Sequence, residues 1–189
     1  MSAEPLTKID RWDGEDWVPV RYGDVWVRQK TSGPERLAIA PSEKPLDVMR
    51  ALAEAWQGGY FLLYVLLIPR REDHPAGRYQ SPGPLSFAQV TEFCETFGAF
   101  LESDGRHHFW IGSVGDEGIL VYDQHGVLYA YGDLPRYIDL LTARGFGEGE
   151  VRFPAPHRHH YHPANNAALE AMLAYWEWGY FPLQPGDER

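Results

Sequence analysis

The chain has 189 residues, of which 44% are hydrophobic and 14% aromatic, so it can bury a sizeable core and is not expected to be disordered. Its 27 acidic residues exceed its 17 basic ones and give a net charge of −10, which opposes binding to DNA, RNA or anionic lipid and favours a basic protein partner. A single cysteine, Cys94, excludes an internal disulfide, and no apolar run approaches the roughly 20 residues that a membrane-spanning helix needs, so we expect a cytoplasmic protein.

The first part of the chain predicts short strands before a helix. Residues 1–16 are expected to form a flexible acidic leader, which leaves one domain over residues 17–189. Alternating apolar positions predict two short strands within residues 17–29 and a third over residues 36–40. Apolar residues at helical spacing predict a helix over residues 45–57, before Gly-Gly.

The apolar run at residues 60–68 predicts a central strand covered on both faces, because it is short and bounded by Gly-Gly and proline. Residues 69–85 are rich in proline, glycine and charge and predict a long polar loop. A helix over residues 86–104 follows, and its opening sequence SFAQ matches a capping box.

A three-stranded antiparallel meander is predicted over residues 108–131, because three apolar runs are joined by turn-like links. Helices are predicted over residues 134–144, with Asp133 as the N-cap, and over residues 164–178. We therefore expect an α+β fold: a single domain with a mostly antiparallel sheet of about six strands covered by about four helices.

The sequence PAPHRHHYHP at residues 154–163 holds four of the eight histidines. Its prolines exclude a central place in a sheet, so an edge or loop position is expected. Side chains alternate along an extended segment. His157 and His159 then share one face, and His160 and His162 share the other.

A His-x-His pair on a strand can provide two ligands to zinc or iron, but a catalytic zinc needs three protein ligands. The pair His157 and His159 would need a third ligand from elsewhere in the chain. The candidates are His125, Asp123, His107 and His108. The alternative is a hydrogen-bonded or surface-exposed histidine cluster without metal.

Two further clusters hold candidate site residues. Asp104, Arg106 and His107 lie at a predicted helix-to-strand junction, and Asp123 and His125 lie in a predicted turn. Each also has a structural explanation, as a turn or as an ion pair. The full candidate site consists of Asp104, Arg106, His107, His108, Asp123, His125, His157 and His159, with His157, His159 and His125 as the metal ligands.

Two functional hypotheses remain open, because no established catalytic motif occurs in the sequence. The first is an acidic binding protein without a cofactor that occludes a basic partner, in the manner of a bacterial immunity protein that neutralises a toxin. The second is a small histidine-site hydrolase that uses zinc or another divalent metal. The acidic excess and the missing motifs favour the first.

Overall fold

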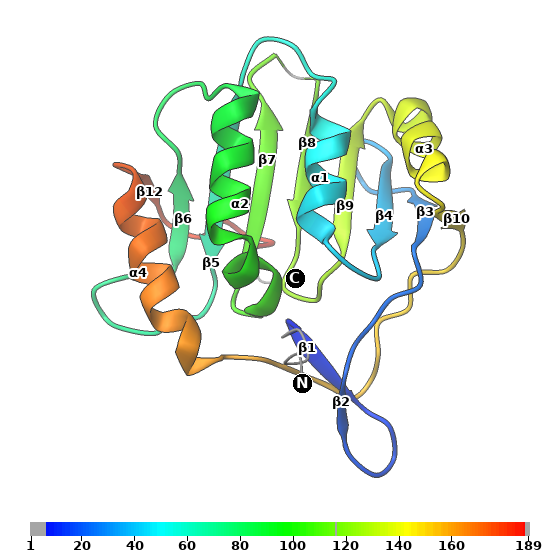
Figure 1. Ribbon diagram of the computed structural model, residues 1–189, viewed down its shortest axis with the longest axis horizontal. Helices are drawn as coiled ribbons and strands as arrows, with labels where there is room; N and C mark the ends of the chain where they lie inside the picture. The colour runs from blue at the N-terminus through cyan, green and yellow to red at the C-terminus, as the bar shows by residue number, and fades with distance from the viewer. Residues whose placement is uncertain (1–6, 116, 188–189) are drawn as a thin grey trace.

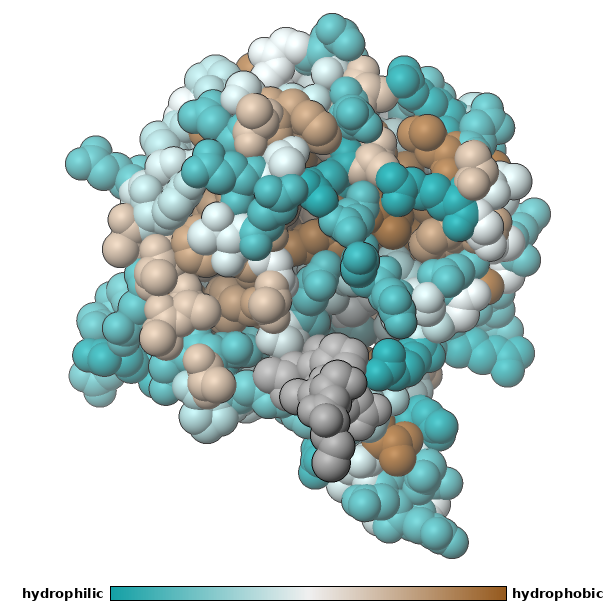
Figure 2. Space-filling view, in the orientation of Figure 1, coloured by the Kyte–Doolittle hydropathy of each residue, from teal (hydrophilic) through white to brown (hydrophobic). Residues whose placement is uncertain are grey.

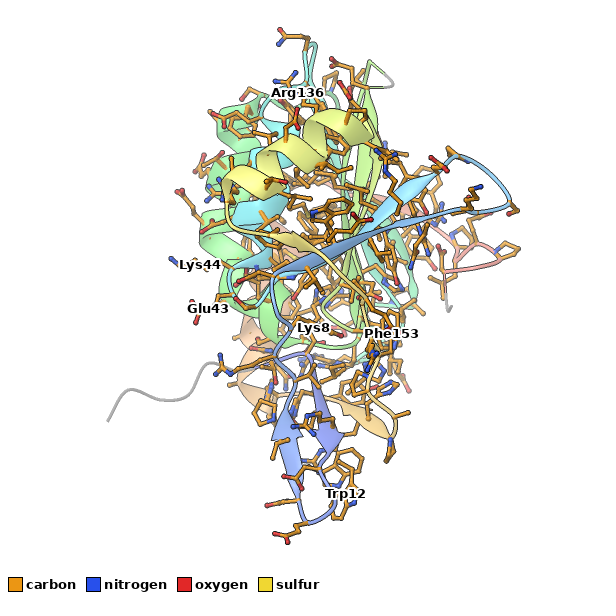
Figure 3. The ribbon with its side chains drawn as sticks, turned by 90° about the vertical axis from the view of Figure 1, so that its right-hand side faces the viewer. Lys8, Trp12, Glu43, Lys44, Arg136 and Phe153 are labelled. Atoms are coloured by element: carbon orange, nitrogen blue, oxygen red, sulfur yellow. The ribbon has the colours of Figure 1, made fainter. Side chains whose placement is uncertain are left out.

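A nine-stranded sheet forms the centre of the fold, and helices pack against one of its faces (Figures 1 and 3). The computed structural model describes residues 7–115 and 117–187. Neighbouring strands are antiparallel except at one edge, where β10 and β3 are parallel. In order across the sheet, the strands are β10 (Gly147–Glu148), β3 (Val25–Gln29), β4 (Arg36–Ala40), β9 (Leu128–Gly132), β8 (Gly118–Tyr122), β7 (His107–Ser113), β5 (Tyr60–Leu66), β6 (Gly77–Gln80) and β12 (Gly179–Phe181).

Four α-helices are present in the described residues, and their ends follow local sequence signals. They are α1 (Pro45–Ala53), α2 (Phe87–Ser103), α3 (Leu134–Ala143) and α4 (Asn166–Tyr175), the last preceded by a 3-10 turn, η1 (Pro163–Asn165). Ser86 and Gln89 form the predicted capping box at the start of α2, and Asp133 caps α3 by accepting from the Arg136 N–H. None of these helices is both long and apolar enough to cross a bilayer.

The main core lies between the sheet and the helices. Apolar side chains of α1 and α2 pack on alternate residues of the central strands, such as Phe109 and Ile111 of β7. Cys94 of α2 belongs to this core, and burial raises the pKa of its thiol to about 12, as expected for an unreactive cysteine. On the helical side, Figure 2 shows a mainly hydrophilic surface with tan to brown apolar patches among the helices.

A second, three-stranded sheet projects from the end of the large one (Figure 1). It consists of β11 (His157–His159), β1 (Ile9–Trp12) and β2 (Trp17–Pro19), in that order, with both pairs antiparallel. The histidine strand β11 is therefore an edge strand, as the flanking prolines predict.

The predicted fold class is confirmed, but the number of strands is twice the predicted one, since twelve strands form in the described residues. The extra strands are two to four residues long and lack an alternating pattern that could be recognised locally. The predicted loop at residues 69–85 is one example, because β6 forms within it and pairs with β5 and β12. The helices over residues 45–57 and 164–178 are also shorter than predicted.

The segment expected to be a flexible leader contributes to the fold instead. Residues 1–6 lie outside the described residues, but Lys8, Ile9 and Asp10 are almost fully buried. Strand β1 pairs with β11, which is about 150 positions away in the sequence. A pairing of this kind depends on tertiary structure and leaves no local signal.

Candidate metal centre

The turn between β8 and β9 fixes the first histidine of the centre. The carboxylate of Asp123 accepts hydrogen bonds from the backbone N–H groups of His125 (2.9 Å) and Val127 (2.8 Å). Gly126 adopts a φ of +84°, which favours glycine and closes the turn. The other Asp123 oxygen lies 3.0 Å from Nδ1 of His125 and so orients the imidazole.

Strand β1 positions the other two histidines opposite this turn. In the β1–β11 register, Ile9 lies across from His159 and Arg11 across from His157. Lys8, which precedes β1, donates from its buried amine to the backbone carbonyls of Asp123 (3.0 Å) and His107 (3.3 Å). The N-terminal segment therefore connects β11 to the ends of β7 and β8.

His125, His157 and His159 form a compact cluster. Their ring centroids are 5.1 to 5.3 Å apart in all three pairs. One ligand nitrogen from each residue lies within 4.8 Å of the other two. Phe153 packs edge-on against His125 and forms an apolar wall at this side of the cluster. The turn that carries His125 and the extended segment that carries His157 and His159 thus lie side by side, as the predicted set of ligands requires.

An oxygen holds the second nitrogen of two of the three rings. Nδ1 of His125 lies 3.0 Å from the Asp123 carboxylate, and Nδ1 of His157 lies 3.0 Å from the Pro154 carbonyl. These contacts fix the tautomers with Nε2 unprotonated and free to bind an ion. The Gln124 carbonyl interacts with His159, whose Nδ1 is buried without a hydrogen-bond partner in the described chain. Anchoring of this kind is typical of metal-binding histidines.

The surroundings of His159 favour the neutral form of its imidazole. Burial and the neighbouring His125 and His157 lower the pKa of His159 to about 4. Burial opposes ionisation of Asp123, but the hydrogen bonds from His125 and Val127 prevail and hold its carboxyl pKa below the ordinary value. The site therefore combines a neutral imidazole with an ionised supporting carboxylate, the protonation states that metal binding requires.

The remaining histidines of this segment lie on the opposite face of the extended chain. His160 Nε2 lies 2.7 Å from Asp10, and Arg158 binds the same carboxylate at 2.9 Å. The rings of His160 and His162 stack with centroids 4.7 Å apart. The structure thus has the alternation that the sequence predicts, with two separate histidine pairs.

The other candidate site residues have structural roles. His108 is near the cluster, but the Gln124 N–H donates to its Nδ1 (3.2 Å) and its Nε2 lies 2.8 Å from the Asp187 carbonyl. Both nitrogens are occupied, so His108 cannot supply a ligand. Burial lowers its pKa, which keeps it neutral.

Asp104, Arg106 and His107 contact one another instead of the three histidines. Asp104 binds both Arg106 (3.1 Å) and Arg70. His107 lies 3.8 Å from Asp104 and is fully buried against Tyr64. This ionic cluster anchors the junction of α2 and β7, and we remove its members from the candidate site.

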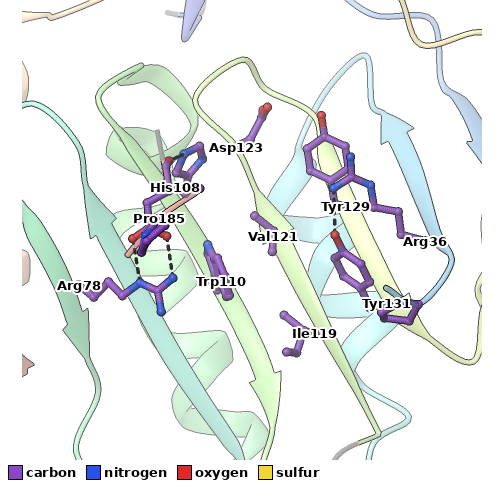
Figure 4. Close-up of a pocket in the computed structure, with 13 residues that line it drawn as sticks. Arg36, Arg78, His108, Trp110, Ile119, Val121, Asp123, Tyr129, Tyr131 and Pro185 are labelled. Carbon is purple, nitrogen blue, oxygen red and sulfur yellow. Dashed lines mark hydrogen bonds and ion pairs between the residues drawn. The ribbon is translucent and has the colours of Figure 1, made fainter. Parts of the chain in front are cut away.

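A cavity of about 490 Å³ lies on the open face of the sheet and reaches Asp123, although none of the three histidines lines it (Figure 4). Asp123 links the cavity to the cluster, since it lines the cavity and contacts His125. The cavity walls hold Arg36, Trp110 and Tyr129, which are not among the predicted site residues. The sequence signal that could have indicated this cavity is the presence of aromatic residues, Trp110 and Tyr129, at outward-facing positions of the predicted strands.

The arrangement is suited to an ion with a preference for imidazole. Tetrahedral zinc holds nitrogens at about 2.0–2.1 Å, which places ligand atoms about 3.4 Å from one another. The spacing of up to 4.8 Å is somewhat wider than this. Small rotations of side chains on an edge strand and a turn can close the difference. Three protein ligands leave a fourth position for water.

Comparisons with protein-family models, with curated proteins and with solved structures gave no match to this chain. The functional argument therefore depends on the geometry of the centre.

Proposed function

We propose that this protein binds one zinc ion through His125, His157 and His159 and uses it to activate water for hydrolysis. The observation that carries the proposal is the mutual approach of three imidazole nitrogens within 4.8 Å. A set of three histidines with an open fourth position is the ligand pattern of catalytic rather than structural zinc. Zinc lowers the pKa of a bound water to about 7 and so supplies a nucleophile at neutral pH.

The supporting contacts favour a built site over a chance cluster. A surface histidine gains little from a fixed tautomer, yet here Asp123 and the Pro154 carbonyl fix two of the three rings. Fixed rings reduce the entropy that is lost when the ion binds. Two cavities reach the centre, one of about 300 Å³ lined by His125 and one of about 490 Å³ lined by Asp123.

Zinc titration of a matched pair of double variants tests this proposal. We expect one tightly bound zinc per chain, lost in His157→Ala/His159→Ala. The control is His160→Ala/His162→Ala, which removes two histidines from the opposite face of the same segment and should retain zinc. Retention of zinc by the first variant, or its loss only in the control, would contradict the assignment.

The hydrolytic part has its own measurement. Zinc-loaded protein should hydrolyse a chromogenic aryl ester faster than the metal-free protein, and His157→Ala/His159→Ala should remove the difference. Zinc binding without any gain in hydrolysis would reduce the function to metal binding.

We also propose a second function, occlusion of a basic protein partner such as a toxin, because of the hairpin that β1 and β2 form. This hairpin projects from the body of the fold (Figures 1 and 3), and its tip carries Asp13, Glu15 and Asp16. Trp12, 40% exposed, lies beside these acids as a potential anchor. Charge attraction speeds association with a basic partner.

This second proposal is tested first by asking whether a neighbouring gene encodes a basic toxin domain, which is then purified and mixed with this protein. We expect its association rate to fall with added salt and in Asp13→Asn/Glu15→Gln/Asp16→Asn. Nanomolar binding that the triple variant leaves unchanged would refute the role of the hairpin.

A further inference from the structure

The cavity on the open face of the sheet contains a cation without a counter-ion. Arg36 of β4 donates to the side-chain oxygens of Gln29 and Tyr131, each at 2.9 Å, and its guanidinium stacks 3.9 Å above the Tyr129 ring. Both hydrogen-bond partners are neutral, and no carboxylate in the described chain pairs with Arg36. Arg36 lines the cavity (Figure 4), and its guanidinium keeps N–H groups that these two contacts do not use.

The second arginine of the cavity is already neutralised. Arg78 binds the Asp187 carboxylate through two hydrogen bonds of 2.7 and 2.9 Å. Arg36 is therefore the one arginine of the cavity without an ion-pair partner in the described chain, in a protein with a net charge of −10. A single charge matches a carboxylate better than a phosphate dianion, and the planar fork of arginine fits a carboxylate in two-point contact.

One other donor in the cavity lacks a partner, because the Tyr129 hydroxyl makes no hydrogen bond within the described chain. Trp110 also lines the cavity, but its Nε1 is buried and does not open into it. Between these groups, Ile119 and Val121 of β8 form an apolar floor.

The charges at the two ends of the cavity would orient a ligand. The strand register places Arg36 of β4 level with Ile119 of β8, four residues before Asp123. The two backbone positions are therefore about 10 Å apart across the sheet and about 13 Å apart along the strands. The ionised Asp123 repels an acid group, so the acid group belongs at the Arg36 end. The opposite end of the ligand then lies beside Asp123, which contacts the zinc ligand His125.

We infer that this cavity binds a small organic acid with a flat apolar body, its carboxylate on Arg36 and its other end directed to the histidine centre. That such an acid is the substrate depends on the proposed hydrolytic function. That it binds in the cavity does not depend on metal.

Calorimetric titration of the metal-free protein with three probes tests the inference. The probes are 2-naphthoate, neutral 2-naphthamide and 2-naphthyl phosphate. We expect naphthoate to bind about 10- to 100-fold more tightly than naphthamide, the range for a hydrogen-bonded charge contact. Equal affinity for these two probes, or tightest binding of the phosphate, would overturn the assignment. This comparison requires no variant.

Variants then locate the contact. Arg36→Gln should remove the preference for naphthoate over naphthamide. The control Arg28→Gln changes an exposed arginine on the neighbouring strand β3, paired with Glu35 at 3.8 Å, and should leave the preference intact. A preference that persists in Arg36→Gln would refute the role of this residue.

Separate zinc titrations distinguish the two proposals. If zinc binds at the three histidines and naphthoate does not bind, the cavity inference fails and the metal centre stands. If naphthoate binds through Arg36 and zinc does not bind, the cavity inference stands and the metal centre fails.

Discussion

Replacement of Asp123 by asparagine should weaken zinc binding without removing a ligand. In the native turn, one carboxylate oxygen accepts from the backbone N–H groups of His125 and Val127, and the other lies 3.0 Å from Nδ1 of His125. Asparagine keeps the first oxygen and places an amide NH2 at the second. This group favours the tautomer that protonates Nε2 of His125, and the protonated nitrogen cannot bind zinc.

The size of the effect follows from what such supporting groups contribute elsewhere. Loss of the partner that orients a ligand typically lowers metal affinity about 10- to 100-fold, or about 1.4 to 2.8 kcal/mol. The metal-free protein also loses a charged hydrogen bond, so its free energy of unfolding should fall by about 1–3 kcal/mol. A competition titration against a chromophoric chelator measures the first effect, and urea unfolding in chelator measures the second.

Asp13→Asn is the matched control for this experiment. Asp13 also closes a turn, accepting from the backbone N–H groups of Glu15 and Asp16 at 2.9 Å each, but it contacts no histidine. Its replacement should leave zinc affinity unchanged. The reasoning is refuted if Asp123→Asn binds zinc as tightly as the native protein, or if Asp13→Asn weakens binding equally.

Three further predictions concern the fold around the centre. Burial lowers the pKa of His107 to about 3, against 6.5 in the unfolded chain, so the free energy of unfolding should fall as the pH drops through this interval. His107→Gln should make the free energy of unfolding less dependent on pH in acid-unfolding curves. Gly132 has a φ of +136°, and a Cβ added there would lie 2.5 Å from the Glu117 carbonyl oxygen. Gly132→Ala should therefore strain the backbone and lower the free energy of unfolding by about 2–4 kcal/mol. An unchanged melting curve would contradict this reasoning. Lys8→Met removes the amine that donates to the His107 and Asp123 carbonyls, of which the Asp123 carbonyl keeps only the Gly126 N–H at 3.3 Å. Urea unfolding should then show a loss of about 1–3 kcal/mol, and zinc titration should show a weaker site because β11 loses a connection to β8.

Local patterns predicted most of the long elements. The α2 helix begins at its capping box, β4 spans the predicted residues, and the meander forms β7, β8 and β9. These elements carry their signals within a few turns or residues of the chain. Short strands such as β6 exist only because longer neighbours pair with them, so no local pattern predicts them.

The candidate centre was predictable in part. Alternation along the extended segment separates His157 and His159 from His160, and the need for a third ligand points to His125. The sequence could not show that β1 connects these segments, since Lys8 reads as part of a polar N-terminus. The sequence also could not show that Asp104, Arg106 and His107 form a buried ionic cluster and not part of the site.

X-ray absorption at the zinc edge tests the metal centre most directly, because it reports the atoms around the ion. The account predicts one zinc per chain with three imidazole nitrogens from His125, His157 and His159 at about 2.0–2.1 Å and one oxygen of a water. The spectrum of His160→Ala/His162→Ala should be the same. A zinc shell dominated by carboxylate oxygens, or a protein that binds no zinc at neutral pH, would contradict it.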